Sequence, residues 1–383
     1  MSRSIYLDHA ATSWPKPPAV EAEVLRCFRE LTANPGRSGH QAALDSARLV
    51  FGVRARLARY FGVADSAHVV FTRGATEGIN LVLKGLLRPG DRVAVSPLEH
   101  NAVMRPLTRL ARERGIEAET LPADGLGRID IEAAARLDGR FRLAAIAHGS
   151  NVNGAVQDVG ALARAMPGTP ILLDAAQTAG VVPIDMQALD IDLLAFTGHK
   201  GLLGPTGTGG LVIGERVRAE RIAPLIQGGT GTKSESEEQP GMLPEMLESG
   251  TPNGVGIAGL LAAVEYVTER GVEAIRAHEM ALTQQILDGL ADAPGVRLYG
   301  PRDPARQTGT VALTIDGLRV SEVGLRLDDE FGVLSRVGLQ CAPMAHRTIG
   351  TFPEGTVRLA PEVFTTHEEI DQTVHAVRVI ANR

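Results

Sequence analysis

A lysine lies in the turn that follows a short apolar run, and the run is typical of a buried strand. The run spans 193–196, and the residues after it include Thr197, His199 and Lys200. In open α/β sheets, ligands bind beyond the carboxyl ends of the strands. A lysine amine at that edge, beside a hydroxyl and an imidazole, suggests Schiff-base chemistry. A surface lysine after a strand is the simpler interpretation of this segment alone, so the other strand ends decide between the two.

A carboxylate ends a second apolar run. Asp174 follows 171–173, and a buried carboxylate costs free energy unless it meets a positive partner. A pyridinium N–H is such a partner, and it needs a carboxylate to stay protonated and to act as an electron sink. The alternative, that Asp174 only caps the next segment, explains this residue but not its combination with Lys200.

The turn after a third expected strand, in the segment 71–80, has the features of an anion-binding site. The segment 71–80 ends a strand, passes through a turn with Ala75 and Thr76, and begins a helix. Free backbone N–H groups and a hydroxyl at a helix N-terminus suit a phosphate. A simple capping turn is the alternative. Taken together, a lysine, a carboxylate and a phosphate cradle at three strand ends describe a site for pyridoxal 5'-phosphate.

Two further residues near strand ends have two interpretations each. His100 could stack on a flat ligand, or it could cap the helix expected over 101–114. Asn151 could hydrogen-bond a ligand, or it could shape the turn in which it lies.

Composition and charge limit the classes of function. The chain has 383 residues, a net charge of −6 and two cysteines, Cys27 and Cys341. Nothing indicates a basic surface for nucleic acid or a polybasic membrane anchor, and no apolar run approaches the ~18 residues that a membrane span needs. The first residues lack the apolar stretch of a signal peptide, and no cysteine and histidine spacing indicates a metal or a disulfide framework. We expect a cytoplasmic protein that binds neither nucleic acid nor membrane.

From residue 68 onward, short apolar runs alternate with helical stretches. This alternation predicts an α/β fold with a mostly parallel sheet covered on both faces. The expected strands are 68–71, 92–95, 118–121, 143–147, 171–173, 193–196 and 210–213. The expected helices before and between them are 21–31, a long one ending near 61, 76–87 and 101–114. In the first helix, Cys27 is expected to be a buried packing thiol.

The composition changes after residue 254. Before it, 228–248 is rich in Gly, Ser, Thr and Glu, which predicts an exposed, mobile loop. After it, an α+β unit is expected. Its helices are 255–270, 272–290, 320–331 and one from 367, and its strands are 296–298, 310–315 and 356–359. We therefore expect a large domain over 17–255 and a small domain from 1–16 and 256–383.

Eight short motifs, taken in order, resemble one enzyme family. They are Tyr-Leu-Asp-His-Ala-Ala (6–11), Arg-Gly-Ala-Thr-Glu-Gly-Ile-Asn (73–80), Glu-His-Asn (99–101), Ser-Asn-Val-Asn-Gly (150–154), Asp-Ala-Ala-Gln (174–177), Thr-Gly-His-Lys (197–200), Glu-Ser-Gly-Thr-Pro-Asn (248–253) and Val-Arg-Leu-Ala (357–360). The chain resembles the class V aminotransferase group of fold-type I pyridoxal-phosphate enzymes, and within it the cysteine desulfurase and selenocysteine lyase family. The resemblance spans nearly the whole chain.

The resemblance implies a role for each matching residue. Lys200 would bond the cofactor and move protons, Asp174 would pair with the pyridine nitrogen, and His100 would stack on the ring. The other implied cofactor contacts are Gln177 and Asn151 at the phenolic oxygen, and Ala75, Thr76, Thr197 and His199 at the phosphate. The implied substrate pocket consists of His9, Ala10, Asn151 and Arg358, where Arg358 would hold the substrate carboxylate with its planar fork.

The resemblance also implies a homodimer with shared active sites. Thr251 would reach the phosphate of the partner subunit's cofactor. The loop 228–248 would then lie near the interface between the two subunits.

Cys341 decides the finer assignment. In desulfurases, a cysteine on a small-domain loop attacks the substrate sulfur and leaves a persulfide and alanine. The nucleophile is the thiolate, so a nearby cation such as His346 or Arg347 would help by lowering its pKa. The alternative is an inert buried thiol. The loop reads Gln-Cys-Ala-Pro-Met-Ala-His, which is nearer to the His-Cys-Ala form of one main branch than to the Ser-Ala-Cys form of the other.

The expected function is removal of sulfur from L-cysteine by a homodimeric pyridoxal-phosphate enzyme, with a sulfur-acceptor protein as a candidate partner. One alternative is a selenocysteine lyase, another C–S lyase or a class V aminotransferase, with Cys341 incidental. Another is a member that binds the cofactor or a partner without turnover. Intact Lys200, Asp174 and Arg358 argue against the last.

Overall fold

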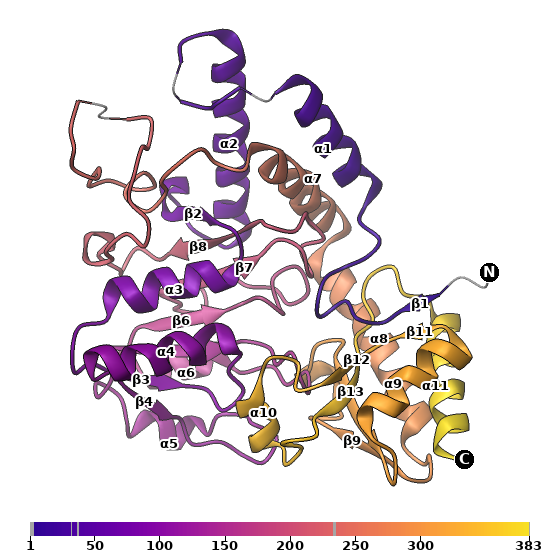
Figure 1. Ribbon diagram of the computed structural model, residues 1–383. Helices are drawn as coiled ribbons and strands as arrows, with labels where there is room; N and C mark the ends of the chain where they lie inside the picture. Colours follow the sequence, from indigo (N-terminus) through magenta and orange to yellow (C-terminus); the bar gives the residue numbers. More distant parts are fainter. Residues whose placement is uncertain (1–3, 32, 37, 233–234, 383) are drawn as a thin grey trace.

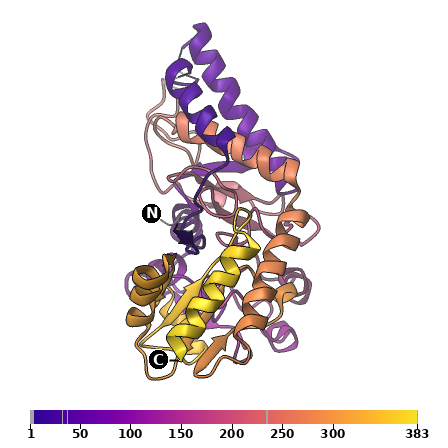
Figure 2. The same ribbon diagram turned by 90° about the vertical axis from the view of Figure 1, so that its right-hand side faces the viewer.

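The chain forms two parts of unequal size, each built on its own sheet (Figure 1). The computed structural model describes residues 4–31, 33–36, 38–232 and 235–382. Seen from the side, the helices α1 and α2 lie at one end of an elongated molecule and the smaller part at the other (Figure 2). In the described residues, no helix has both the length and the apolar character needed to cross a membrane.

The large part contains a seven-stranded sheet in the order β2-β8-β7-β6-β5-β3-β4. Its strands are β2 (Val69–Thr72), β3 (Arg92–Val95), β4 (Glu117–Thr120), β5 (Leu143–Ala147), β6 (Ile171–Asp174), β7 (Leu193–Thr197) and β8 (Gly209–Ile213). Only β8 runs antiparallel to its neighbours, and the remaining strand pairs are parallel. The predicted α/β fold with a mostly parallel sheet is confirmed.

The inner strands β5 to β8 are buried on both faces because nearly all of their residues are apolar, whereas the edge strand β4 is mostly polar and exposed. On β5, Ala144 and Ile146 belong to one hydrophobic cluster, while Leu143 and Ala145 belong to another. The first cluster takes in α2 (Gln41–Tyr60), α5 (Ile131–Ala135), α6 (Val159–Ala165) and α7 (Gly254–Arg270). The second takes in α3 (Ala75–Leu86) and α4 (Asn101–Arg114). Burial on both faces leaves the carboxyl edge of the sheet as the place for polar side chains.

The small part has an antiparallel sheet in the order β12-β13-β10-β9. Its strands are β9 (Val296–Tyr299), β10 (Val311–Ile315), β12 (Arg336–Gly338) and β13 (Thr356–Leu359), and its helices are α8 (Val272–Leu290), α9 (Val320–Phe331), α10 (Pro343–Thr348) and α11 (His367–Ala381). The first strand, β1 (Ile5–Tyr6), pairs with β11 (Val333–Leu334), so the N-terminal residues lie on this part. The predicted domain limits stay a prediction.

The helix α1 (Pro18–Glu30) buries only part of its apolar side chains. Cys27 is fully buried, as predicted. Two apolar side chains of the same helix, Leu25 and Phe28, are 43% and 67% exposed. An apolar face on α1 is therefore left without cover in this single chain.

The predicted exposed loop over 228–248 is wrong at its end. No helix or strand occurs in its described residues, but Met246 and Leu247 are buried in the cluster that includes α3 and α4. Glu248 pairs with Arg54 of α2 at 2.7 Å. Its last residues are thus fastened to the large part, while mobility of the rest stays a prediction.

Candidate active site

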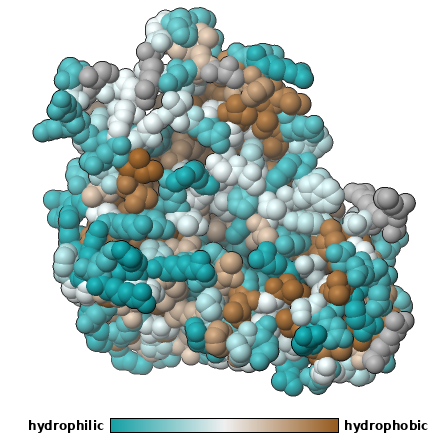
Figure 3. Space-filling view, viewed as in Figure 1, coloured by the Kyte–Doolittle hydropathy of each residue, from teal (hydrophilic) through white to brown (hydrophobic). Residues whose placement is uncertain are grey.

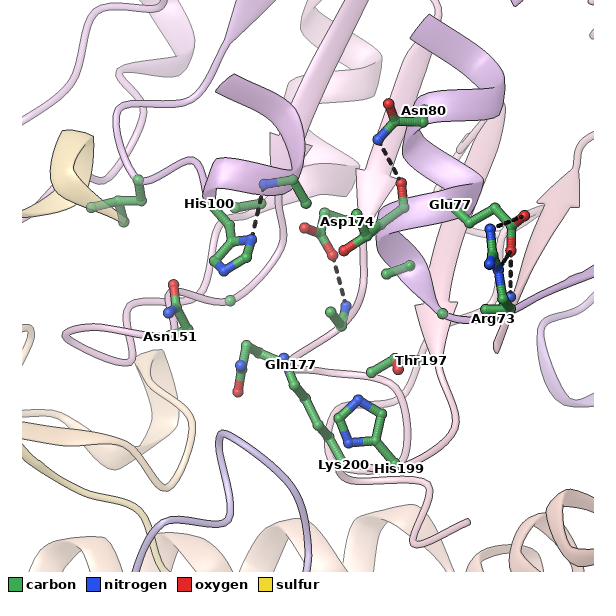
Figure 4. A pocket seen from close by; sticks show the side chains of 18 of the residues that line it. Arg73, Glu77, Asn80, His100, Asn151, Asp174, Gln177, Thr197, His199 and Lys200 are labelled. Carbon is green, nitrogen blue, oxygen red and sulfur yellow. Dashed lines mark hydrogen bonds and ion pairs between the residues drawn. The ribbon is translucent and has the colours of Figure 1, made fainter. Parts of the chain in front are cut away.

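A cavity of about 440 Å³ lies beyond the carboxyl ends of β6 and β7 (Figure 4). It brings together nine of the residues singled out in the sequence. They are Ala75, Thr76, His100, Asn151, Asp174, Gln177, Thr197, His199 and Lys200. Residues more than a hundred positions apart converge there because consecutive parallel strands end at the same edge.

One end of the cavity is formed by the start of helix α3. Gly74, the residue before the helix, has a φ of 152° that favours glycine, and no side chain among the described residues caps the helix. A Cβ at this position would stand 3.3 Å from the Thr197 hydroxyl oxygen. Ala75 and Thr76, the first helical residues, line the cavity. An uncapped helix N-terminus beside a hydroxyl is a site for an anion such as phosphate.

Asp174 lies deep in the cavity wall at the end of β6. Burial raises the pKa of its carboxyl group, while a hydrogen bond from the Ala176 N–H at 2.9 Å and the nearby Lys200 lower it. A buried carboxylate with so few partners is stabilised by a cationic group placed against it. It therefore suits a protonated ring nitrogen.

Lys200 follows β7, and its amine is less basic than usual. Burial lowers its pKa to about 8, and the charges of Asp174, Cys341 and Asp8 only partly oppose this. In Figure 4, the side chains of His100, Asp174 and Lys200 extend toward the same space. An amine that loses its proton near neutral pH can act as a nucleophile or a base.

His100 has the capping role considered for it, while its stacking on a ligand stays a prediction. It caps α4, because its Nδ1 accepts a hydrogen bond from the Ala102 N–H at 3.0 Å, and it also lines the cavity. Burial and the charge of Lys200 lower its pKa to about 4. The ring is therefore uncharged with its proton on Nε2. Such a ring can stack on a flat ligand and can hold or give a proton at Nε2.

The N-terminal segment is hydrogen-bonded to two residues that line the cavity. Gln177 donates to the Ala10 carbonyl oxygen at 3.0 Å, and His199 Nδ1 lies 3.1 Å from the Thr12 hydroxyl. His9 and Ala10 line a second cavity of about 30 Å³, which shares Gln177 and Lys200 with the first. The predicted substrate residues near the chain start thus adjoin the lysine.

Arg358 on β13 is 3% exposed and faces the large part. It donates to the Asn151 carbonyl oxygen at 2.9 Å and forms an ion pair with Asp8. Its Nε has no partner among the described residues. A buried N–H without a partner favours a carboxylate oxygen as a ligand. Sequence reasoning missed Asp8, although it lies within the first of the eight motifs.

The loop that carries Cys341 rests against the same residues. The Asn101 N–H donates to the Cys341 carbonyl oxygen at 2.9 Å, and the Asn151 side chain donates to the Gln340 carbonyl oxygen at 2.6 Å. Cys341 itself is exposed, so the expectation that it lies on a loop is met. The Asn151 side chain is therefore engaged with this loop in addition to lining the cavity.

The prediction that His346 supplies a positive charge to Cys341 is wrong. His346 is fully buried, and burial lowers its pKa to about 4, so the imidazole is uncharged. The other candidate, Arg347, stacks over the Phe352 ring at 4.2 Å.

Comparison with known proteins identifies the family. Residues 5–373 match the family described as aminotransferase class V. The chain belongs to the class V aminotransferase family.

Relatives in this family match over nearly their whole length. The chain is 35% identical to a probable cysteine desulfurase of Methanothermobacter thermautotrophicus, over 98% of this chain and 94% of the relative. It is also 35% identical to a cysteine desulfurase of Salmonella agona, over 96% and 91%. The solved structure of a cysteine desulfurase from Thermococcus onnurineus superposes with a TM-score of 0.93 at 30% identity, covering 99% and 95%. These matches support the fold-type I assignment of this class V chain.

The structure reveals the surroundings of Thr251 and Glu99, which the sequence did not show. Thr251 lies in a separate groove beside α2, where its hydroxyl accepts from Asn34 at 3.2 Å, so one chain does not bring it to the cavity.

Glu99 is fully buried next to His100 and accepts from Ser96 Oγ and the Ala147 N–H at 2.5 and 2.6 Å. Burial raises the Glu99 pKa to about 8, which keeps a second negative charge away from Asp174. Its place in the Glu-His-Asn motif could have pointed to it.

The cavity fits pyridoxal phosphate by the chemistry of its walls. It offers an uncapped helix start for a phosphate, a buried carboxylate for a ring nitrogen and a weakly basic lysine for a carbonyl carbon. These three groups match the three polar parts of the cofactor.

Proposed function

We propose that this class V enzyme is a cysteine desulfurase that depends on pyridoxal 5'-phosphate. The observation that carries the proposal is the exposed Cys341 on a loop bonded to Asn151. Asn151 also lines the cavity of Lys200 and holds Arg358. A thiol, a carboxylate-binding arginine and a lysine base are thus connected through one residue. The printed names of the relatives agree with this assignment.

The residues that would hold the cofactor follow from the cavity. Lys200 would bond it, Asp174 would face its ring nitrogen and His100 would cover its ring. Its phosphate would lie at the start of α3, with Ala75, Thr76, Thr197 and His199 around it. When bound, the cofactor withdraws electrons from the substrate Cα and so weakens the bonds around that carbon.

Arg358 and Lys200 would act on the amino acid itself. The Nε–H of Arg358 has no partner in the part of the chain that the structure describes, so it would donate to a carboxylate oxygen of L-cysteine and fix the position of Cα. Lys200, with its lowered pKa, would take the proton from Cα at its Nζ and return a proton later. The segment with His9 and Ala10 would exclude water from this side.

Cys341 would complete the reaction as the nucleophile. Its thiolate would attack the substrate sulfur, so that an S–S bond forms and the Cβ–S bond breaks. The electron pair of the Cβ–S bond stays with Cβ, which takes up a proton. His100 would hold or move that proton at Nε2. The products are L-alanine and a persulfide on Cys341, which would pass its sulfur to an acceptor.

The assembly and compartment belong to the same proposal. Thr251 would contact the phosphate in a partner subunit, which makes the active unit a homodimer. Both cysteines are free, which suits a reducing compartment such as the cytoplasm.

A product analysis tests the proposal. The wild type should convert L-cysteine to equal amounts of alanine and transferable sulfur, and Cys341→Ala should form neither. Cys27→Ala is the matched control and should retain activity, because that thiol is buried within α1 and does not line the cavity. Full activity of Cys341→Ala would remove the thiol from the mechanism.

A further inference from the structure

Two residues at the turn of the cysteine loop adopt left-handed backbone conformations. Gln340 has φ 41° and Cys341 has φ 59°. Neither is a glycine, and such strained conformations persist only where the surroundings hold them. Cys341 is exposed and Gln340 is 5% exposed. The contacts that hold the turn must therefore come largely through Gln340.

Gln340 is held by three elements of the fold. Its side-chain Nε2 donates to the Thr356 carbonyl oxygen on β13 at 2.9 Å. Its side-chain Oε1 lies 2.8 Å from His346 Nε2 on α10. Its main-chain oxygen accepts from the Asn151 side chain of the large part at 2.6 Å. Both polar atoms of the Gln340 side-chain amide and its main-chain oxygen are thus hydrogen-bonded.

The chemistry of the neighbours makes an amide the fitting side chain. The Thr356 carbonyl can only accept, so the amide nitrogen must face it and the amide oxygen must face His346. His346 is uncharged, so its Nε2 donates to Gln340 and its Nδ1 accepts from the Thr351 hydroxyl at 2.7 Å. A side chain without both a donor and an acceptor would leave a buried polar group unpaired, which is destabilising.

We propose that Gln340 is a positioning residue that fixes Cys341 in the orientation needed to attack the substrate sulfur. This inference rests on the proposed desulfurase function. The Cys341 carbonyl is bonded to the N–H of Asn101, next to His100, and Asn151 joins the turn to Arg358. Holding Gln340 therefore fixes the thiol relative to both the ring-covering histidine and the substrate carboxylate.

Kinetics of Gln340→Leu test the positioning role. Leucine has a similar size but lacks both amide groups. We expect kcat for L-cysteine to fall roughly ten- to a hundredfold, because a misplaced reacting group loses this much. KM and cofactor content should stay close to the wild type. The matched control is Gln307→Leu, because Gln307 is another buried glutamine of the small part, bonded to the Thr310 carbonyl at 3.3 Å, and it should retain kcat.

A second variant, Gln340→Glu, tests the role through the pH dependence of kcat, which a purely structural role would not change. A protonated glutamate at position 340 can donate to Thr356 and accept from His346, whereas a carboxylate cannot donate. Relative to the wild type, kcat of Gln340→Glu should therefore rise as pH falls. This variant also serves if the leucine variant fails to fold.

Hydrogen exchange separates this inference from the proposed function. Without substrate, backbone amides over 339–346 should exchange faster in Gln340→Leu than in Gln307→Leu. Unchanged exchange, or faster exchange with an unchanged kcat, would overturn the positioning role while wild-type turnover keeps the desulfurase function. A wild type that forms no alanine from L-cysteine would reject the desulfurase function and with it the attack step, whatever the exchange result.

Discussion

The Lys200 amine is the group on which the chemistry of the cavity depends. Its lowered pKa follows from burial at the end of β7, and Asp174 limits the shift without cancelling it. Reactivity toward a carbonyl belongs to the uncharged amine. The position of one lysine in the fold thus sets the pH range in which the site can work.

The first prediction concerns the pH at which cofactor-free protein takes up pyridoxal phosphate. With a pKa of about 8 in the folded state, Lys200 is protonated below that pH and uncharged above it. The rate of uptake, followed by absorbance, should therefore rise with pH around a midpoint of about 8. Lys200→Ala should not develop the absorbance of the bonded cofactor. A midpoint near the ordinary lysine pKa of about 10.4 would contradict the effect of burial.

The second prediction concerns Arg358→Lys. A lysine keeps the charge but loses the planar fork and the free Nε–H. KM for L-cysteine should rise by about ten- to a hundredfold, which corresponds to the roughly 1.5–3 kcal/mol of a hydrogen bond to a charged group. Cysteamine, which lacks the carboxylate, is the matched substrate, and its weaker turnover should change little. Equal losses for both substrates would mean that Arg358 does not bind the carboxylate.

At this scale, local patterns predicted single residues well but not their distant partners. Lys200 and Asp174 could be predicted because Asp174 directly follows an apolar run and Lys200 lies in the turn after another. The ion pair of Asp8 with Arg358 joins residues 350 positions apart, and no local pattern encodes it. The buried, uncharged state of His346 depends on the packing of α10, which sequence reasoning did not include.

At the scale of secondary-structure elements, the ion pair between Arg54 and Glu248 attaches the end of the long loop 228–248 to the large part. Glu248 accepts two hydrogen bonds from Arg54, at 2.7 and 2.9 Å, and one from the Phe71 N–H at 2.5 Å. Arg54 also lies over the Phe71 ring at 4.5 Å. The end of the connection is thereby tied to α2 and β2.

The third prediction is that Arg54→Ala loosens this connection. Removing one partner of a largely buried pair should lower the free energy of unfolding by roughly 2–4 kcal/mol, and limited proteolysis within 228–248 should become faster. Arg48→Ala is the matched control, since Arg48 lies on the same helix in an exposed pair with Asp45. It should change stability by less than about 0.5 kcal/mol. Equal effects of both variants would show that Arg54 does not fasten the connection.

Elements were predictable where the apolar pattern was long or uniform. The inner strands β5, β6 and β7 contain uninterrupted apolar runs, and α8 was predicted with its observed bounds, 272–290. The short elements α5, α10, β11 and β12 were missed because few residues leave no clear period. The burial of Met246 and Leu247 was missed because the segment before them is polar.

At the scale of the whole molecule, a single chain leaves apolar surface uncovered. Apolar residues gather in the space-filling view over the region of α1 (Figure 3). Phe28 on α1 and Phe51 on α2 are 67% and 63% exposed. Large apolar groups at the surface mark interaction sites. The homodimer proposed above would bury them.

The fourth prediction is that charges on this surface dissociate the dimer. Wild type should sediment with twice the 40.5 kDa mass of the chain, and Phe28→Asp combined with Phe51→Asp should sediment as a monomer with weaker cofactor binding. Leu325→Asp is the control, because Leu325 on α9 is similarly exposed, at 61%, on the small part. A monomeric wild type would contradict the proposed role of Thr251 in a partner's site.

The most direct test of the central claim is mass spectrometry of the peptides that contain Cys341 and Cys27 after one turnover with L-cysteine. The account predicts that the Cys341 peptide becomes one sulfur atom heavier, in step with the alanine formed, while the Cys27 peptide stays unchanged. Alanine formed without any added sulfur on Cys341, with free sulfide released directly from the substrate, would contradict it.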